Sequence, residues 1–155
     1  MDPKVSYLLM FPGGVLGEDQ LQMVKELYLE LLLYEMDLIP ETFEGTCNTS
    51  EEALGELIDN VDGCLLLLYD GEPAGLLTTD RGAPSEIAGL YLKEPYRNKH
   101  LGVAMVRCWA AANGHTHIGV TCFVENVGAK RFYERLGFVF DKAKMLTTKG
   151  TCEFN

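Results

Sequence analysis

The sequence predicts a mixed α/β fold in which helices cover the faces of a mixed sheet. Short apolar runs of strand length alternate along the chain with segments whose apolar residues recur at three- and four-residue intervals. These segments follow one another in the order β-α-α-β-β-β-α-β-α-β. With 155 residues, no linker and no internal repeat, the chain is expected to form a single domain over residues 1–155.

The amino-terminal half opens with an apolar stretch, residues 4–11, which predicts a first strand ended by a Pro-Gly-Gly turn. Residues 18–37 predict a long helix, whose surplus of apolar residues leaves room for a homodimer. Residues 39–49 are expected to form a loop. Residues 50–60 predict a shorter helix, with Ser50 as its N-cap and acidic residues in its first turn.

The middle of the chain predicts neighbouring strands. Residues 63–69 and 74–79 are apolar and should pair as a hairpin around a turn at residues 70–73. Residues 85–92 should extend this hairpin into a meander.

The carboxyl-terminal part alternates helices with strands. Helices are predicted at residues 101–113 and 126–136, with a strand at residues 117–124 between them. Gly137 stands where a left-handed residue commonly ends a helix. A last strand is expected over residues 138–148.

Charge is distributed unevenly along the chain, whose net charge is −10. Residues 1–92 carry 3 Lys and Arg against 18 Asp and Glu, and residues 93–155 carry 10 against 5, so the two parts hold −15 and +5. Acidic residues that merely solvate helices would explain much of this. The alternative is two half-sites, a basic one for a phosphorylated ligand and an acidic one for a cationic ligand. So acidic a chain makes nucleic acid an unexpected partner.

The five cysteines are odd in number and show no C-x-x-C spacing, which favours reduced thiols in a cytoplasmic protein. The first residues show no signal-peptide pattern and the apolar runs are too short to cross a bilayer, so no membrane partner is expected. Cys108 and Cys122 should be small buried apolar residues. His115 and His117 are expected at the surface or in turns, and no metal site is expected, because they lack Cys or acidic partners.

A short polar turn, residues 93–100, separates a predicted strand from a helix that begins at Leu101. Backbone N–H groups in the first turn of a helix lack intrahelical partners, and the helix dipole adds partial positive charge there. Arg97 and Lys99 add full charges beside them. The turn is therefore predicted to bind an anion, with phosphate the favoured kind.

Two segments resemble motifs of the GNAT acetyltransferase superfamily. The family's cofactor loop has Arg or Gln, two residues, Gly, one residue, then Gly or Ala, and it is similar to Arg97-Asn98-Lys99-His100-Leu101-Gly102. The family's later motif, N-x-x-A-x-x-F-Y-x-x-x-G-F, matches residues 126–138 at every marked position. The resemblance is strong over residues 86–138, and the pair of motifs is fairly specific. It implies a GNAT-like α/β (α+β) fold with a central mixed, mostly antiparallel sheet of about six to seven strands and helices on both faces.

One residue departs from the family pattern. His100 stands where the family usually has Gly, and a positive φ would cost a His more than a Gly. Asn98, at another frequent Gly position, is well suited to a positive φ. A protonated His100 could instead donate a hydrogen bond to phosphate.

The resemblance implies acetyl-CoA as co-substrate, with its pyrophosphate on the loop. The residues implied there are Arg97, Asn98, Lys99, His100, Leu101, Gly102 and Val103. The backbone of Leu90 and Leu92 would hold the thioester carbonyl and the pantetheine arm. Asn126, Ala129 and Tyr133 of the second motif complete the implied cofactor site.

Two residues are candidates for the chemistry. Tyr133 resembles the family tyrosine that protonates the departing thiolate, the alternative being an aromatic ring packed beside Phe132. Glu86 lies on the strand where some branches of the family carry a glutamate general base, which an amine nucleophile needs in order to be neutral. By alternation it should share a strand face with Leu90 and Leu92. An exposed strand carboxylate is an equal alternative, and many relatives use water chains.

These motifs together imply an N-acetyltransferase that moves acetyl from acetyl-CoA to a primary amine by direct attack on the thioester. The acidic amino half favours a cationic acceptor, either a small amine such as a polyamine or amino sugar, or a lysine or N-terminal amine of a protein. A catalytically weak GNAT-like acyl-CoA binding or regulatory module is the second hypothesis. Binding of some other phosphorylated ligand at the loop is the third.

Overall fold

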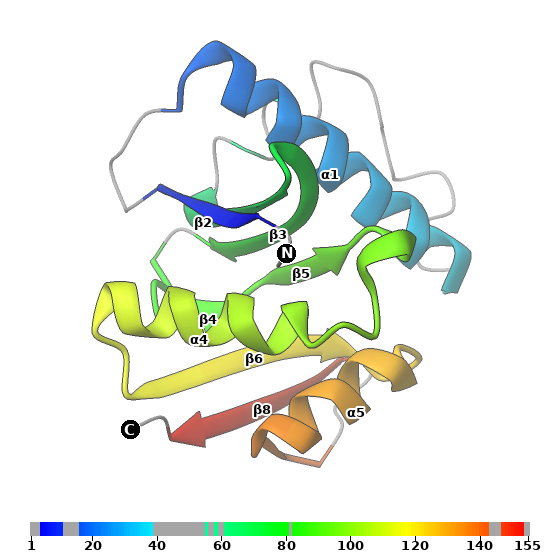
Figure 1. Cartoon of the computed structure of the whole chain (residues 1–155). Coiled ribbons are helices and arrows are strands. Elements are labelled where there is room, and N and C mark those ends of the chain that lie inside the picture. Colours follow the sequence, from blue (N-terminus) through cyan, green and yellow to red (C-terminus); the bar gives the residue numbers. More distant parts are fainter. Residues whose placement is uncertain are drawn as a thin grey trace.

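The computed structural model describes residues 4–10, 16–38, 55, 58, 61–80, 82–142 and 147–153. Its strands are β1 (Val5–Met10), β2 (Val61–Tyr69), β3 (Glu72–Asp80), β4 (Glu86–Ile87), β5 (Gly89–Leu92), β6 (His117–Phe123), β7 (Val139–Phe140) and β8 (Thr147–Glu153). Its helices are α1 (Glu18–Leu38), the short 3₁₀ helix η1 (Glu94–Tyr96), α4 (Leu101–Asn113) and α5 (Val127–Leu136) (Figure 1).

The strands form two four-stranded sheets, in the orders β1-β2-β3-β5 and β4-β6-β8-β7. All pairings in the first sheet are antiparallel. In the second, β4 pairs in parallel with β6 and the other pairings are antiparallel. The predicted mixed, mostly antiparallel strand pairing is therefore confirmed, but it is divided between two sheets instead of lying in one central sheet. The described residues contain more strands than expected because two predicted strands are each divided.

The first divided strand is the one predicted at residues 85–92. It breaks at Ala88, whose N–H donates to the Thr78 carbonyl at 2.8 Å. On one side β4 pairs with β6 in the second sheet, and on the other β5 stays beside β3 in the first. The prediction that Glu86 shares a strand face with Leu90 and Leu92 is therefore wrong, because alternation does not carry across a change of sheet. A hydrophobic pattern cannot reveal such a change of partner.

The second divided strand is the one predicted at residues 138–148. Only Val139–Phe140 is β7, and the longer β8 begins at Thr147, beyond most of the predicted range. The β8 sequence, TTKGTCE, has too few apolar residues to stand out in a hydrophobic pattern. It is held instead by its antiparallel pairing with β6 along its length.

The other predicted elements need smaller changes. The turn between β2 and β3 is shorter than predicted, since only Asp70 and Gly71, both with positive φ, separate the two strands. The loop predicted at residues 39–49 lies outside the described residues. Of the helix predicted at residues 50–60, Gly55 and Ile58 are described and both are helical, and the rest of it lies outside the described residues.

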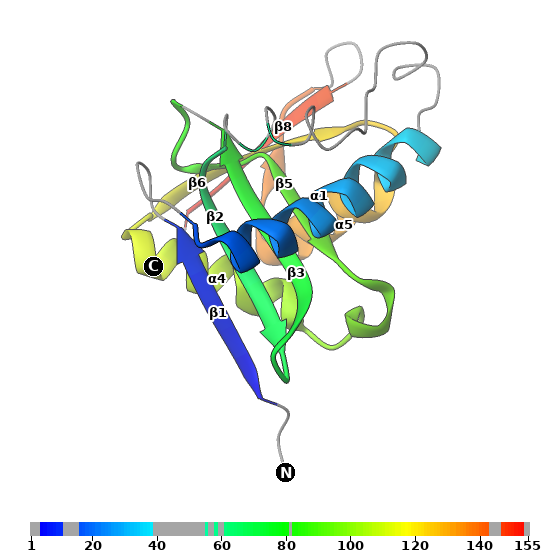
Figure 2. The ribbon, with the colours of Figure 1, turned by 90° about the horizontal axis from the view of Figure 1, so that it is seen from above.

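Helices cover both faces of the first sheet, as predicted. Alternate residues of β2 divide between two apolar clusters, with Leu65 and Leu67 in the cluster of α4 and α5 and Leu66 in the cluster of α1. Both faces of β2 are thus buried, which explains its continuous apolar run. Figure 2 shows α1 crossing one face of this sheet, with α4 and α5 behind it. In the described part of the chain, no helix combines the length and apolarity needed to cross a membrane.

Candidate functional site

The candidate site lies along the edge of strand β5 that faces away from β3. The Lys93 N–H bonds the Ala74 carbonyl of β3 at 2.9 Å, and backbone groups alternate in direction along a strand. The N–H and C=O groups of Leu90 and Leu92 therefore point away from β3. They point toward the side on which β4 and β6 belong to the second sheet and do not pair with β5. The Leu92 carbonyl accepts a hydrogen bond there from Arg97 Nε at 2.8 Å.

The turn after β5 has two residues in the left-handed region. Asn98 has φ 62° and His100 has φ 61°, so the positive φ considered at both positions is present. His100 is the N-cap residue of α4, and no side chain caps the helix. The first-turn N–H groups of α4 thus keep their capacity to bind an anion. The side chains of Asn98, Lys99 and His100 are exposed.

A cavity of about 220 Å³, called here the β5 cavity, lies beside this turn. Its lining comes from α1, β5, the turn, α4 and α5: Leu31, Tyr34, Leu90, Tyr91, Leu92, Arg97, Gly102, Asn126, Ala129, Phe132 and Tyr133. Seven of the twelve residues implied for cofactor binding are among them. The other five lie at the turn and the start of α4 without lining the cavity, and they are Asn98, Lys99, His100, Leu101 and Val103.

Gly102 lets α4 and α5 approach at the edge of this cavity. A Cβ atom on Gly102 would lie 3.0 Å from Phe132 Cε1 and 3.5 Å from Leu92 Cδ1. Such a separation from the ring is shorter than ordinary van der Waals contact. A glycine at this position therefore matters for its small size, since its φ is not positive.

Helix α5 places Tyr133 against the cavity. The Asn126 side chain caps the helix by accepting from the Ala129 N–H at 3.2 Å, and Gly137 ends it in the left-handed conformation, both as predicted. The Tyr133 ring meets those of Phe132 and Phe138 edge-on, each at 5.2 Å between centroids. Tyr133 lines the cavity, as the family resemblance implies, and its buried ring also packs beside Phe132, as the alternative has it.

Tyr133 is held in its protonated form. Its side chain is only 4% exposed, and burial raises the pKa of the phenol far above its ordinary value. The negative charges of Cys122 and Glu35, when those groups ionise, raise it further. A phenol with this pKa stays protonated throughout the physiological range and can donate a hydrogen bond there.

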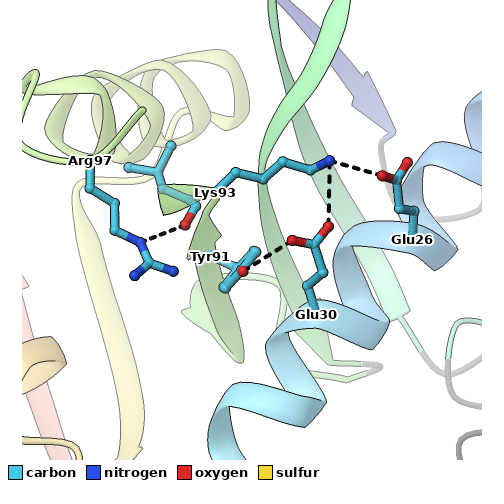
Figure 3. A network of polar contacts seen from close by, with 6 residues as sticks. Glu26, Glu30, Tyr91, Lys93 and Arg97 are labelled. Atoms are coloured by element: carbon cyan, nitrogen blue, oxygen red, sulfur yellow. Dashed lines mark hydrogen bonds and ion pairs between the residues drawn. The ribbon is translucent and has the colours of Figure 1, made fainter. Parts of the chain in front are cut away.

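A polar network ties α1 to the end of β5 (Figure 3). Lys93 Nζ lies 2.8 Å from Glu26 Oε1 and 3.5 Å from Glu30 Oε2, and the Tyr91 hydroxyl donates to Glu30 at 3.2 Å. The Arg97 guanidinium lies over the Tyr91 ring, 5.5 Å from its centroid. Two acidic residues of α1 are thus engaged in holding the helix over β5, and such partly exposed ion pairs contribute about 0–1 kcal/mol each.

A second cavity of about 200 Å³, called here the carboxylate cavity, lies between α1, β4 and β6. Its lining comprises Glu35, Ala83, Glu86, Ile87, Ala88, Thr121, Cys122 and Phe123. Glu86 lines it from β4 and also lines a separate cavity together with Gly119, where a Cβ atom would lie 3.2 Å from Glu86 Cγ. The structure thus places Glu86 in a cavity distinct from the one that Leu90 and Leu92 line.

The sequence reasoning missed Glu35. Burial raises the pKa of its carboxyl group from 4.5 to about 7. The signal that could have found it is the spacing along α1, in which Leu27, Leu31 and Glu35 follow one another at four-residue intervals. The two leucines are buried, so the carboxyl group continues an apolar stripe.

The histidines and cysteines fall outside the β5 cavity. His117 is exposed and pairs with Glu153 at 2.9 Å, as befits a surface residue. His115 follows α4 with its ring 5.1 Å from that of Trp109, and its buried Nε2 has no hydrogen-bond partner in the part of the chain that the structure describes. Cys108 is half-buried, and burial raises the pKa of the Cys122 thiol. Within the described ranges no three His, Cys, Asp or Glu side chains gather into a group that could hold a metal ion.

Comparison with known proteins gives one family and many similar structures. The model of the acetyltransferase (GNAT) family matches residues 27–138. A crystal structure of PaiA N-acetyltransferase from Thermoplasma acidophilum in complex with coenzyme A is similar, with 17% identity, a TM-score of 0.64, and coverage of 96% of this chain and 99% of that one. An acetyltransferase from Thermus thermophilus shares 19% identity, with a TM-score of 0.65 and 97% of each chain covered.

A third similar structure is YncA from Salmonella typhimurium, described as a putative acetyltransferase with its cofactor acetyl-CoA. It shares 15% identity, with a TM-score of 0.59, and the match covers 96% of this chain and 94% of that one. At these identities the similarity shows the fold alone. No curated protein matches the chain significantly.

Proposed function

Since the chain belongs to the acetyltransferase (GNAT) family, we propose that it is an N-acetyltransferase that moves acetyl from acetyl-CoA to a primary amine by direct attack on the thioester. The observation that carries this proposal is the convergence of three features on the β5 cavity. They are the outward-facing backbone of β5, the uncapped start of α4, and the protonated phenol of Tyr133.

The cofactor would lie along β5 with its pyrophosphate on the turn. The phosphates would accept from the backbone N–H groups of Asn98, Lys99, His100, Gly102 and Val103, aided by the dipole of α4. Arg97, bonded to Leu92, would brace the turn against β5 and would add positive charge nearby. Two structures of similar fold are described with coenzyme A or acetyl-CoA bound, which supports the same ligand here.

Tyr133 would protonate the departing thiolate. Attack of an amine on a thioester first forms an oxyanion and then expels a thiolate, which needs a proton. The phenol is a weaker acid here than in water. A thiol in the same pocket would also be a weaker acid, because burial raises the free energy of either anion. Cys64 illustrates this effect, because burial raises its pKa to about 11.

The acceptor amine would approach from the carboxylate cavity. Glu86, the base that the family resemblance implies, lines that cavity, where a bound amine must lose a proton directly or through water. Two carboxyl groups in the lining favour a cationic acceptor, whether a small amine or an amine of a protein. Four free thiols among the described residues support a cytoplasmic location.

Mass spectrometry of purified protein incubated with acetyl-CoA and a panel of primary amines tests the activity. We expect acetylated products from at least one cationic amine. Replacement of Tyr133 by Phe should lower kcat at least tenfold and leave the Kd for coenzyme A within about twofold. If no amine is acetylated, the enzymatic proposal fails, and an equal loss of binding and turnover in Tyr133→Phe would contradict the role of the phenol.

A coenzyme A binding or regulatory module without transfer is the second candidate. The conformation of His100 favours it, because a non-glycine residue with φ 61° stands at the loop position where the family usually has Gly. Saturable binding of coenzyme A, measured by calorimetry, together with no acyl transfer to any amine would support this candidate over the first.

A further inference from the structure

We propose that Glu35, on the first helix, is the group that takes the proton from the acceptor ammonium, and that the carboxylate cavity therefore selects protonated primary amines. This inference rests on the proposed N-acetyltransferase function. It goes beyond that function by moving the base from strand β4 to helix α1 and by giving Glu86 a different task.

The position of Glu35 along α1 supports the assignment. Leu31 lies one turn before it and Tyr34 directly before it, and both line the β5 cavity, whereas Glu35 itself lines the carboxylate cavity. The divided strand also contributes to both linings, since Ala88 lines one cavity and Leu90 lines the other. Glu35 therefore lines the cavity for the amine from a helix that also lines the cavity for the thioester.

The link between Glu35 and Tyr133 strengthens the assignment. The charge of Glu35 acts on the phenol of Tyr133, which lines the β5 cavity from α5. Of the two carboxyl groups in the carboxylate cavity, Glu35 is the one that influences Tyr133 in this way. The two groups are thus coupled electrostatically, as a proton acceptor and a proton donor of one reaction would be.

The surroundings of Glu35 suit a base that works near neutral pH. Desolvation raises its pKa to about 7, so the carboxyl group is divided between its two forms at neutral pH. The titratable groups that line the cavity beside Glu35 are Glu86 on β4 and Cys122 on β6. From α5, Tyr133 is coupled to Glu35, and Lys130 and Glu134 act on Cys122. The described lining itself contains no cation, so a positive charge within the cavity would come from the substrate.

The step balances in atoms and charge. The Glu35 carboxylate takes one proton from the ammonium, and the neutral nitrogen attacks the thioester carbonyl and forms the N–C bond. The C–S bond breaks, its electron pair goes to sulfur, and the sulfur receives a proton from Tyr133. The nitrogen loses its second proton, which restores Tyr133, and the proton on Glu35 leaves to solvent. Glu86, which lines the same cavity, holds the cation before transfer.

Rates of acetyl transfer measured from pH 5.5 to 9 test this inference. The acceptor should be an amine whose own pKa exceeds about 10, so that its titration lies above the range. We expect kcat of the wild type to rise with pH through an inflection near 7. Glu35→Gln should lower kcat about 100-fold and remove the inflection. Glu35→Asp should keep the inflection at a reduced rate.

Two matched variants complete the design. Glu86→Gln should raise the KM for the amine about tenfold and keep the inflection, and Asp37→Asn, an exposed residue on the same helix, should change neither quantity. The Kd for coenzyme A should stay within twofold in every variant, which also reports correct folding.

Several results would overturn the inference. They are a Glu35→Gln variant with the wild-type pH profile, loss of the inflection in Glu86→Gln instead, or equal acetylation of alcohols and amines. These results differ from failure of the proposed function, in which the wild type acetylates no amine at any pH.

Discussion

Replacing Glu35 by Gln should stabilise the protein at alkaline pH. The folded protein keeps the Glu35 proton up to about pH 7, whereas the unfolded chain releases it near pH 4.5. Between these values the folded state binds more protons than the unfolded state, so the free energy of unfolding falls as pH rises. Below pH 4.5 both states hold the proton and the penalty disappears.

The size of the stability gain in Glu35→Gln follows from the shift in the pKa of Glu35. A rise in pKa from 4.5 to about 7 corresponds to about 3 kcal/mol of lost stability once the carboxyl group is ionised. The Glu35 side chain is only partly buried, and solvent screening lowers this to about 2 kcal/mol. The amide of Gln never ionises. The variant should therefore be about 2 kcal/mol more stable than the wild type at pH 8 and nearly equal to it at pH 4.

Urea and thermal unfolding of wild type, Glu35→Gln and Asp37→Asn at both pH values give the comparison. The gain at pH 8 should appear as a rise in Tm of about 4–8 °C. Asp37→Asn, at an exposed position on the same helix, is the matched control for the loss of one carboxyl group. If Glu35→Gln differs from the wild type by the same amount at both pH values, Glu35 does not titrate abnormally in the folded protein and the reasoning is refuted.

Three further variants probe the turn after β5. His100→Gly should remove the strain of a non-glycine residue in the left-handed region and raise the free energy of unfolding by about 1 kcal/mol, measured in a thermal melt. An unchanged Tm would show that the backbone at His100 is not strained. Gly102→Ala places a methyl group 3.0 Å from the Phe132 ring, so calorimetry should give a Kd for coenzyme A at least tenfold weaker, and unchanged affinity would argue against this edge of the cavity. Arg97→Ala loses the bond to the Leu92 carbonyl and should also weaken coenzyme A binding about tenfold; recovery of full affinity in Arg97→Lys would show that charge alone matters there.

The elements with strong local signals were predictable from the sequence. Helix α5 is fixed at one end by the Asn126 cap and at the other by left-handed Gly137, and both signals are local. The turn before α4 was predictable for the same reason, because Asn98 and His100 at frequent Gly positions pointed to positive φ. Seven residues that the family resemblance implies for cofactor binding line one cavity in the fold.

The features that depend on long-range pairing were not predictable in this way. The division of a strand at Ala88 depends on which distant strands lie beside β4 and β5, and β8 is held by β6 rather than by its own hydrophobic pattern. Glu35 was missed because a carboxyl group near the end of a helix rich in acidic residues resembles a solvated one. Only packing reveals that this carboxyl group continues the buried stripe of α1.

The central claim is that the turn after β5 binds a diphosphate through its backbone and so places a thioester beside Tyr133. A crystal structure of the protein with coenzyme A tests it most directly. The expected result has phosphate oxygens within hydrogen-bond distance of backbone N–H groups between Asn98 and Val103, and the sulfur next to the Tyr133 hydroxyl. Coenzyme A bound elsewhere, or no bound coenzyme A at a saturating concentration, would contradict the claim.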